Sequence, residues 1–183
     1  MTRPLRLAAA LIAGLLGGTA LLLAPTRAAQ VEPLPEELRR LPSELGYGYR
    51  AFHRQCVKCH TMDRVNEQDD LTLRQWRDLI GKMASKDDAQ IPPRDQRYIL
   101  MYVEHRRNAR LDAEGKQQYL TFLDRCDGCH GIGLVYERRV PRAEWPETVS
   151  RMARKGGVKI TPTDEASILA YTLRMAEDLF GLE

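Results

Sequence analysis

The fold is decided by a short run of residues that occurs twice: Cys56-Val57-Lys58-Cys59-His60 and, seventy positions later, Cys126-Asp127-Gly128-Cys129-His130. Both runs have the form C-x-x-C-H, and together they contain all four cysteines of the 183-residue chain. No cysteine is left over to suggest a separate reactive thiol. We therefore interpret the two runs as two copies of one kind of site.

The similarity between the two copies extends well beyond the cysteines. At the offset that aligns the motifs, Tyr49 and Phe52 match Tyr119 and Phe122. With the offset shortened by one, the matches are Trp76/Trp145, Met83/Met152, Ile91/Ile160, Pro93/Pro162, Ile99/Ile168, Leu100/Leu169 and Tyr102/Tyr171. A repeat of this length indicates a duplicated small domain, and we place the two domains at residues 44–109 and 110–183.

Two thiols followed directly by an imidazole form the attachment signature of a c-type haem. The thiols would form two thioethers with one porphyrin, and the histidine would bind its iron. The predicted attachment residues are Cys56, Cys59, Cys126 and Cys129, and the predicted proximal ligands are His60 and His130. The alternatives are a disulfide scaffold with three pairings, two zinc knuckles, or a thiol redox pair. None of them requires a histidine after both cysteine pairs, so the sequence predicts two covalently bound haem c groups.

The repeat also predicts the sixth iron ligands. Met83 follows its motif histidine at almost the same separation as Met152 follows the other, and each stretch is long enough to pass round the edge of a porphyrin. The alternative is that both are core residues of an amphipathic helix, because a Trp and a Met seven positions apart share a helix face. Methionine ligation would raise the potential relative to an iron bound by two histidines, and it would close both irons to substrate.

The remaining histidines and methionines have no such repeat. We interpret His53 and His105 as surface histidines, and Met101 and Met175 as core residues of the last helix of each copy.

The coarse pattern is helical throughout, and no run alternates with period two, so the predicted fold class is all-α. The aromatic residues spaced i, i+3 predict a helix leading into each motif. Further helices are expected over residues 72–84 and 142–154, with Gly156 and Gly157 ending the second. Residues 60–71 are predicted to form a polar loop, and Pro92, Pro93 and Pro162 to precede the last helix of each copy.

The first 29 residues predict export. Two arginines precede residues 7–24, which carry no charge and are mostly Leu and Ala. This pattern is typical of a secretory signal or, if it is retained, of an N-terminal membrane anchor. Residues 30–43 contain three prolines and are predicted to be a linker. We therefore expect the two predicted domains to lie in the periplasm, either soluble or tethered to the inner membrane.

The charge balance bears on partners. The formal net charge is 28 − 25 = +3, but three arginines lie in residues 1–29, so the rest has 25 basic and 25 acidic residues. A nucleic-acid-binding face needs a basic excess, and we expect no nucleic-acid partner.

Taken together, residues 44–180 resemble class I cytochrome c domains in tandem, as in the di-haem domain of quinohaemoprotein amine dehydrogenases. The resemblance is carried by the two C-x-x-C-H motifs, by Trp76-x6-Met83 and Trp145-x6-Met152, and by the Ile-Leu-x-Tyr pattern of the last helices. It implies two small three-helix domains, each wrapped around one covalently attached haem, that relay single electrons between redox partner proteins. We expect a carrier and not an enzyme. The alternatives are a small haem enzyme of peroxidase or thiosulfate-oxidising type, which needs an open iron position, or an electron-transfer subunit of a periplasmic dehydrogenase.

Overall fold

A computed structural model describes residues 33–138 and 140–181. Within these residues the regular structure is entirely helical and contains no β-strand, which confirms the all-α prediction. The predicted export segment at residues 1–29 lies outside the described residues. Among the described helices, none combines the length and the apolar character needed to cross a bilayer.

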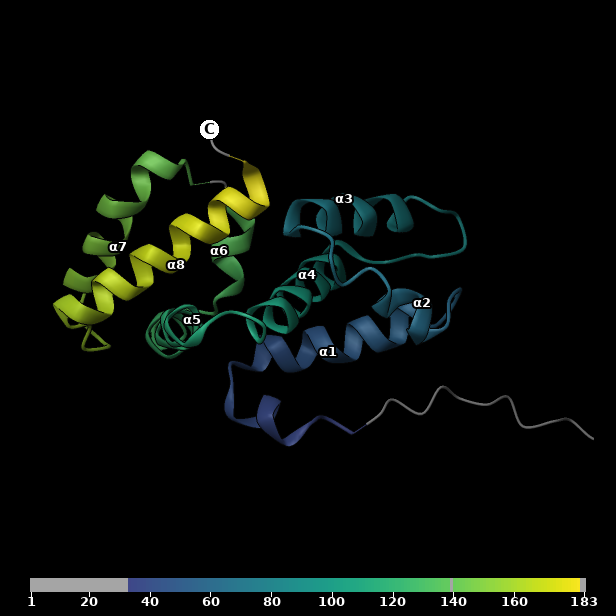
Figure 1. The fold of residues 1–183 in the computed structure, drawn as a ribbon, viewed down its shortest axis with the longest axis horizontal. Helices are drawn as coiled ribbons and strands as arrows, with labels where there is room; N and C mark the ends of the chain where they lie inside the picture. Colours follow the sequence, from purple (N-terminus) through teal and green to yellow (C-terminus); the bar gives the residue numbers. More distant parts are fainter. Residues whose placement is uncertain (1–32, 139, 182–183) are drawn as a thin grey trace, which may run out of the picture.

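The same arrangement of three longer helices occurs in both halves of the chain (Figure 1). In the first half, up to residue 109, α1 (Ser43–Cys56) and α3 (Leu73–Ala84) both pack against α4 (Pro93–Asn108). In the second half, from residue 110, α5 (Ala113–Cys126) and α7 (Trp145–Arg154) both pack against α8 (Pro162–Phe180). Each motif begins with the cysteine that ends α1 or α5, so the helix predicted to lead into each motif is present.

Local sequence signals explain where these helices begin. Thr72 accepts a hydrogen bond from the backbone N–H of Gln75, and the Gln75 side chain accepts one from Thr72, which forms a capping box at the start of α3. Thr161 and Asp164 form the same box at the start of α8. Pro93 and Pro162 each occupy the first helical position, where a missing N–H costs no hydrogen bond.

The end of α7 also follows the prediction. The helix stops at Arg154, and Gly156 and Gly157 follow it with φ values of +73° and +101°. These left-handed conformations are accessible to glycine without a steric cost.

Several short elements differ from the sequence prediction. The polar segment 60–71 is not entirely a loop, because it contains the one-turn helix α2 (Met62–Asn66), which Thr61 caps. The helix predicted over residues 142–154 begins with a 3₁₀ turn, η2 (Arg142–Glu144), and α7 itself starts only at Trp145. Two more elements lie in segments without a helical prediction: η1 (Glu36–Arg40), whose Leu38 is buried, and α6 (Gly133–Glu137).

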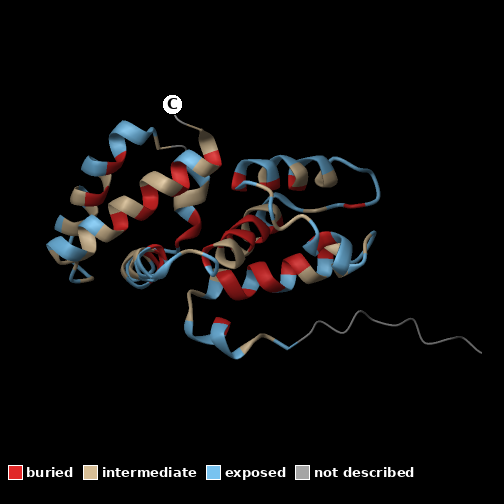
Figure 2. Cartoon of the chain, in the orientation of Figure 1, coloured by how far each residue is buried: buried red, intermediate tan, exposed pale blue. Residues whose placement is uncertain are grey.

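One continuous apolar cluster runs through both halves, and Figure 2 shows buried residues in both of them. It includes Met101 and Met175, which are 0% and 2% exposed, as expected for core residues. In each half a tyrosine of the last helix packs its ring against the aromatic pair of the first. The ring centroid of Tyr102 lies 5.3 Å from that of Phe52, and the centroid of Tyr171 lies 4.7 Å from that of Phe122.

The crossing of α1 over α4 depends on a glycine. A Cβ atom at Gly48 would lie 2.2 Å from the backbone oxygen of Tyr98 and 2.8 Å from the Cβ of Tyr102. Real atoms do not approach so closely, so any larger residue at this position would force the two helices apart.

Polar contacts join the two halves. Asp178 in α8 accepts a hydrogen bond from the backbone N–H of Leu73 at 3.2 Å, and its other carboxylate oxygen pairs with Arg107 of α4. Arg77 of α3 donates to the backbone oxygen of Leu179 at 3.0 Å. Because α3 and α4 both bind α8 in this way, the halves are packed against each other and not merely linked by the chain.

Candidate functional site

The second half encloses a cavity of about 670 Å³. Cys126, Cys129, His130 and Met152 all line it, so the structure brings together the four predicted site residues of this half. Its size falls in the range that binds cofactors and other organic ligands. The other lining residues are Phe122, Arg125, Leu134, Val135, Arg138, Val140, Pro141, Glu144, Trp145, Thr148, Val149, Arg151, Lys155, Gly156, Val158, Ile160, Ile168 and Thr172.

The motif turn is held against the segment that follows α7. A Cβ atom at Gly128 would lie 2.0 Å from a methyl group of Val158, and one at Gly157 would lie 3.1 Å from the sulfur of Cys129. The Cys129 thiol lies 3.7 Å from the backbone oxygen of Gly156, to which it donates a weak hydrogen bond. These close approaches fix the motif turn, including Cys129, against the segment that follows α7.

All four cysteines carry free thiols, so the described structure contains no disulfide scaffold. Burial raises the pKa of Cys56 to about 11 and that of Cys126 to about 12. Thiols of this kind are protonated at neutral pH, whereas the thiols of redox pairs have lowered pKa values. Within residues 33–138 and 140–181, no three His, Cys, Asp or Glu side chains converge as a metal-binding group.

The imidazole of His130 is oriented by the chain next to it. Its Nδ1 lies 3.1 Å from the backbone oxygen of Gly131. When Nδ1 carries the proton and donates to this oxygen, Nε2 keeps its lone pair, as it does in metal-binding histidines. The side chain is exposed at the cavity edge and is therefore accessible to a ligand in the cavity.

Helix α7 provides part of the cavity wall. Trp145, Val149 and Met152 are spaced by four and three residues, so they lie on one face of the helix, and all three line the cavity. The indole Nε1 of Trp145 is buried and has no hydrogen-bond partner. A buried donor without a partner is costly, and here it points to a ligand that offers an acceptor atom.

The polar residues of the cavity have an excess of positive charge. Arg125, Arg138, Arg151 and Lys155 line it, against a single carboxylate, Glu144. The Arg125 guanidinium also pairs with Asp164 at 3.3 Å. A ligand with a large apolar body and negatively charged groups would match these walls. The sequence did not predict that these cations line the site, because charged residues on a solvent-exposed helix face have the same spacing.

The first half carries the equivalent residues on equivalent elements. Cys56 ends α1, Cys59 and His60 lie in the turn after it, and Met83 lies in the last turn of α3. The lining of the 670 Å³ cavity comes entirely from residues 122–172, so the cavity gathers the second set of predicted residues and not the first. The buried Nε1 of Trp76 also has no partner, as in Trp145. The lysine of the first motif, Lys58, donates to the backbone oxygen of Ala89 at 3.3 Å.

The two other histidines pack against aromatic rings. His105 was expected at the surface, but it is partly buried between α4 and α5, where its Nδ1 lies 3.0 Å from the hydroxyl of Tyr119. Burial lowers its pKa. The neighbouring Arg106 and Arg107 favoured a solvated position, but residues 105–107 face different directions around the helix. His53 is also partly buried, with its ring centroid 4.3 Å from that of Tyr49.

Comparisons with protein-family models, with curated proteins and with solved structures return no match to this chain.

Proposed function

We propose that this chain is an exported di-haem c-type cytochrome that relays single electrons between redox partner proteins. One observation carries the proposal: Cys126, Cys129, His130 and Met152, which the repeat singled out, line one cavity large enough for an organic cofactor. The matching residues Cys56, Cys59, His60 and Met83 occur in the first half, on equivalent helices or in the turn that follows the first of them.

The residues of the cavity fit a covalently attached haem. The Cys126 and Cys129 thiols both line the cavity and would form the thioethers, and His130 and Met152 would offer one nitrogen and one sulfur to the iron. The unpaired indole N–H of Trp145 and the excess of cations would bind the carboxylates of such a cofactor. When bound, a haem supplies reversible one-electron chemistry at its iron.

The residues of the cavity would set the reduction potential of the haem and the access of other molecules to its iron. Apolar wall residues such as Val149 and Ile168 would exclude water from a bound haem and would thereby raise its reduction potential. As an iron ligand, the thioether of Met152 would favour the ferrous state and would leave no open position for a substrate. For this reason we propose a carrier, and the two domains would each wrap around one haem.

Mass spectrometry of the native protein tests the assignment. We expect the mass of the chain plus two haems, both of which remain attached in acidified organic solvent. The double variant Cys126→Ala, Cys129→Ala should retain one haem, and removal of all four cysteines should leave none. A native protein without a covalent chromophore would overturn the proposal.

The axial ligands are tested separately. Met152→Ala should lower one midpoint potential and let that haem bind carbon monoxide, and Met83→Ala should do the same at the other haem. Met62→Ala is the matched control, because Met62 is partly buried beside a motif but has no repeat partner. If the wild-type protein binds carbon monoxide rapidly at one haem, the enzyme alternative is favoured.

The N-terminal assignment has its own test. Expression without residues 1–29 should give a protein without haem, because haem attachment would take place only after export. A fully haem-loaded cytoplasmic protein would contradict the periplasmic location.

A further inference from the structure

A buried carboxylate lies where the two halves meet. Glu104 of α4 is only 4% exposed, and its side chain accepts a hydrogen bond from the hydroxyl of Tyr171 of α8 at 2.5 Å. The hydroxyl of Tyr136 of α6 donates a second hydrogen bond to the other carboxylate oxygen. Asn108 donates to the Tyr171 hydroxyl at 3.3 Å. One acid from the first half is therefore held by two tyrosines from the second.

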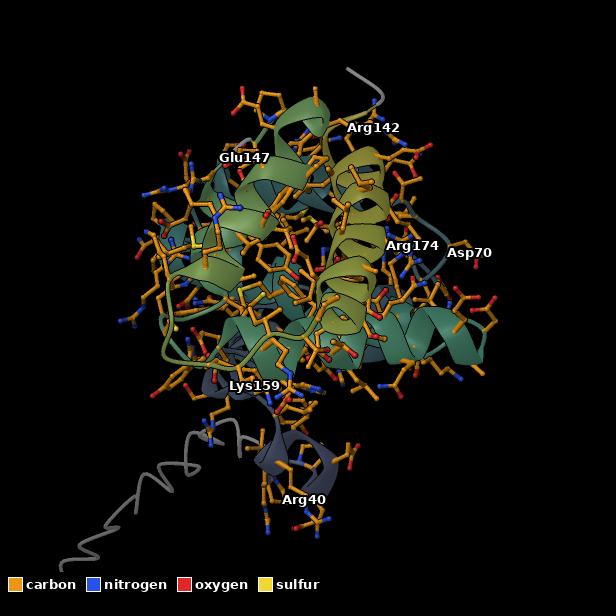
Figure 3. The ribbon with its side chains drawn as sticks, turned by 90° about the vertical axis from the view of Figure 1, so that its left-hand side faces the viewer. Arg40, Asp70, Arg142, Glu147, Lys159 and Arg174 are labelled. Carbon is orange, nitrogen blue, oxygen red and sulfur yellow. The ribbon has the colours of Figure 1, made fainter. Side chains whose placement is uncertain are left out.

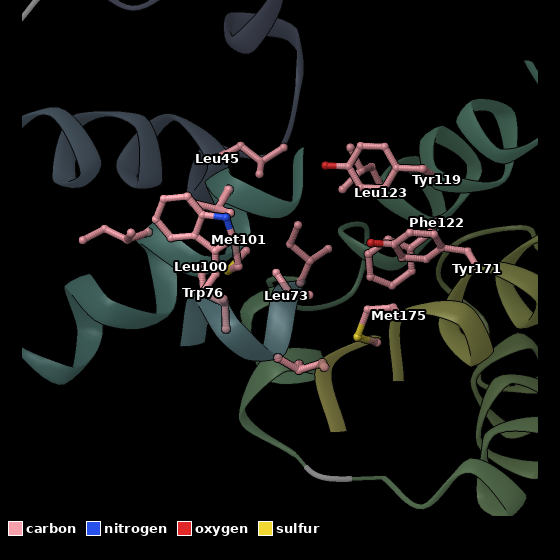
Figure 4. Close-up of a cluster of buried hydrophobic side chains, with 14 of the residues drawn as sticks. Leu45, Leu73, Trp76, Leu100, Met101, Tyr119, Phe122, Leu123, Tyr171 and Met175 are labelled. Atoms are coloured by element: carbon pink, nitrogen blue, oxygen red, sulfur yellow. The ribbon is translucent and has the colours of Figure 1, made fainter. Parts of the chain in front are cut away.

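This carboxylate lies one aromatic layer from the 670 Å³ cavity of the second half. The ring of Tyr171 packs against that of Phe122, with centroids 4.7 Å apart, and Phe122 and Thr172 both line the cavity. Figure 4 shows the hydroxyls of Tyr119 and Tyr171 pointing toward the first half, while Phe122 lies beside Tyr171. A charge that appears in the cavity would therefore interact strongly with Glu104, because the apolar side chains between them screen charge poorly.

Protons have a route to Glu104 despite its burial. A second cavity, of about 410 Å³, is lined by Glu104 together with Arg107, Arg174 and Asp178. Asp70 and Arg110 also line it and are exposed, so the cavity opens to solvent. Figure 3 shows Arg174 and Asp70 on the same side of the molecule.

The surroundings place the titration of Glu104 near neutral pH. Burial raises its pKa from 4.5 to about 7, and the nearby Asp178 adds to the increase. The hydrogen bonds from Tyr136 and Tyr171, and the charge of Arg107, act in the opposite direction.

The other titratable groups around Glu104 come from three places. They are Tyr119 of α5, Arg174 of α8, and Asp69, Asp70 and Arg110 at the mouth of the cavity. Arg110 pairs with Asp69, so these two charges largely offset each other.

We propose that Glu104, held by Tyr136 and Tyr171, is a proton-binding site that takes up a proton when the second-half site gains an electron. This inference rests on the proposed electron-transfer function. The electron comes from the donor protein, and the proton comes from water through the cavity that Glu104 lines. The Glu104 carboxylate becomes the neutral acid, and it returns its proton to solvent when the electron passes to the acceptor. The proton compensates the charge that the electron adds. Reduction of the second-half site therefore favours protonation of Glu104, and protonation of Glu104 favours reduction.

The test is the pH dependence of the midpoint potential in the haem-loaded protein. The haem of the second half is identified as the one whose midpoint potential decreases in Met152→Ala. In the wild type, the midpoint potential of this haem should decrease as the pH rises through 7. A tenfold difference in proton affinity between the oxidised and reduced forms corresponds to about 59 mV for one electron. Glu104→Gln should abolish this dependence, and Glu114→Gln, which changes an exposed glutamate of α5, should retain it.

Two further measurements do not depend on the potential. Reduction in weakly buffered solution should take up a fraction of a proton per electron in the wild type and none in Glu104→Gln. The redox-difference infrared spectrum should show a protonated-carboxyl band that the same variant loses.

The tyrosines provide a second set of variants. Tyr136→Phe removes a hydrogen bond that favours the charged carboxylate, so it should shift the pH dependence to higher pH. If Glu104→Gln fails to fold, the result for Tyr136→Phe decides, and an unchanged pH profile overturns the proposal. A potential that is independent of pH in the wild type, or equally dependent in Glu104→Gln, also overturns it. Haem content distinguishes the two proposals: two haems with a flat profile refute this inference alone, whereas absence of haem refutes both.

Discussion

Glu104→Gln should remove a pH dependence of folding stability that the buried carboxyl creates. In the folded protein its pKa is about 7, against 4.5 for the ordinary glutamate. At about 1.36 kcal/mol for each pH unit, this difference corresponds to about 3 kcal/mol. Because the folded-state pKa is raised, the contribution is fully present below pH 4.5 and is lost as the pH rises through 7. The free energy of unfolding of the wild type should therefore decrease over this interval.

The assay is guanidinium denaturation of the native protein and of Glu104→Gln, measured from about pH 4.5 to about pH 8.5 so that it spans both pKa values. The lowered pKa of His105 works in the opposite direction, because its contribution is present above its ordinary value of 6.5 and is lost as the pH falls. His105 is unchanged in the variant, so the difference between the two proteins isolates Glu104. The difference should change by about 3 kcal/mol across the range. If the two profiles stay parallel, Glu104 does not titrate as the structure indicates, and the reasoning is refuted.

Three further outcomes are expected. Gly48→Ala should lower the free energy of unfolding by about 2 kcal/mol in denaturant titration, because its Cβ would lie 2.2 Å from the backbone oxygen of Tyr98. Gly81→Ala, where a Cβ meets nothing within 4 Å, should instead stabilise α3 by up to about 1 kcal/mol, and a loss similar to that at Gly48 would contradict the packing argument. Thr161→Ala should cost about 1 kcal/mol by removing the capping box of α8, whereas Thr163→Ala, two residues later and exposed, should change the thermal midpoint little; equal effects would refute a capping role.

Helix boundaries could be predicted wherever the deciding signal is local. Thr72, Pro93 and Pro162 act on the backbone within a few residues of themselves, so their effect can be recognised in the sequence. The five-residue helices α2 and α6 are too short to show an apolar period, and they form because the chain must turn between packed helices. Their existence depends on tertiary structure that the local sequence does not reveal.

The candidate site was likewise predictable only where the signal lies in the sequence itself. The repeat predicted which cysteines, histidines and methionines to consider, and the structure brings the second set of them to one cavity. The contacts of Glu104 could not be predicted, since Tyr136 and Tyr171 lie 32 and 67 residues away along the chain. His105 was wrongly expected at the surface for a similar reason, because its partner Tyr119 is on another helix.

The buried acid at the junction is a point at which the two copies of the repeat differ. When the last helices of the two copies are aligned, the counterpart of Glu104 is Leu173, which has no charge to stabilise. The two halves are therefore not equivalent at this junction: only the first carries the carboxyl group, and only the second carries the α6 tyrosine that donates to it. A chain built from two copies of the later half would keep both C-x-x-C-H motifs but have a leucine in place of Glu104 at the junction. One built from two copies of the earlier half would have the acid without the tyrosine that α6 supplies.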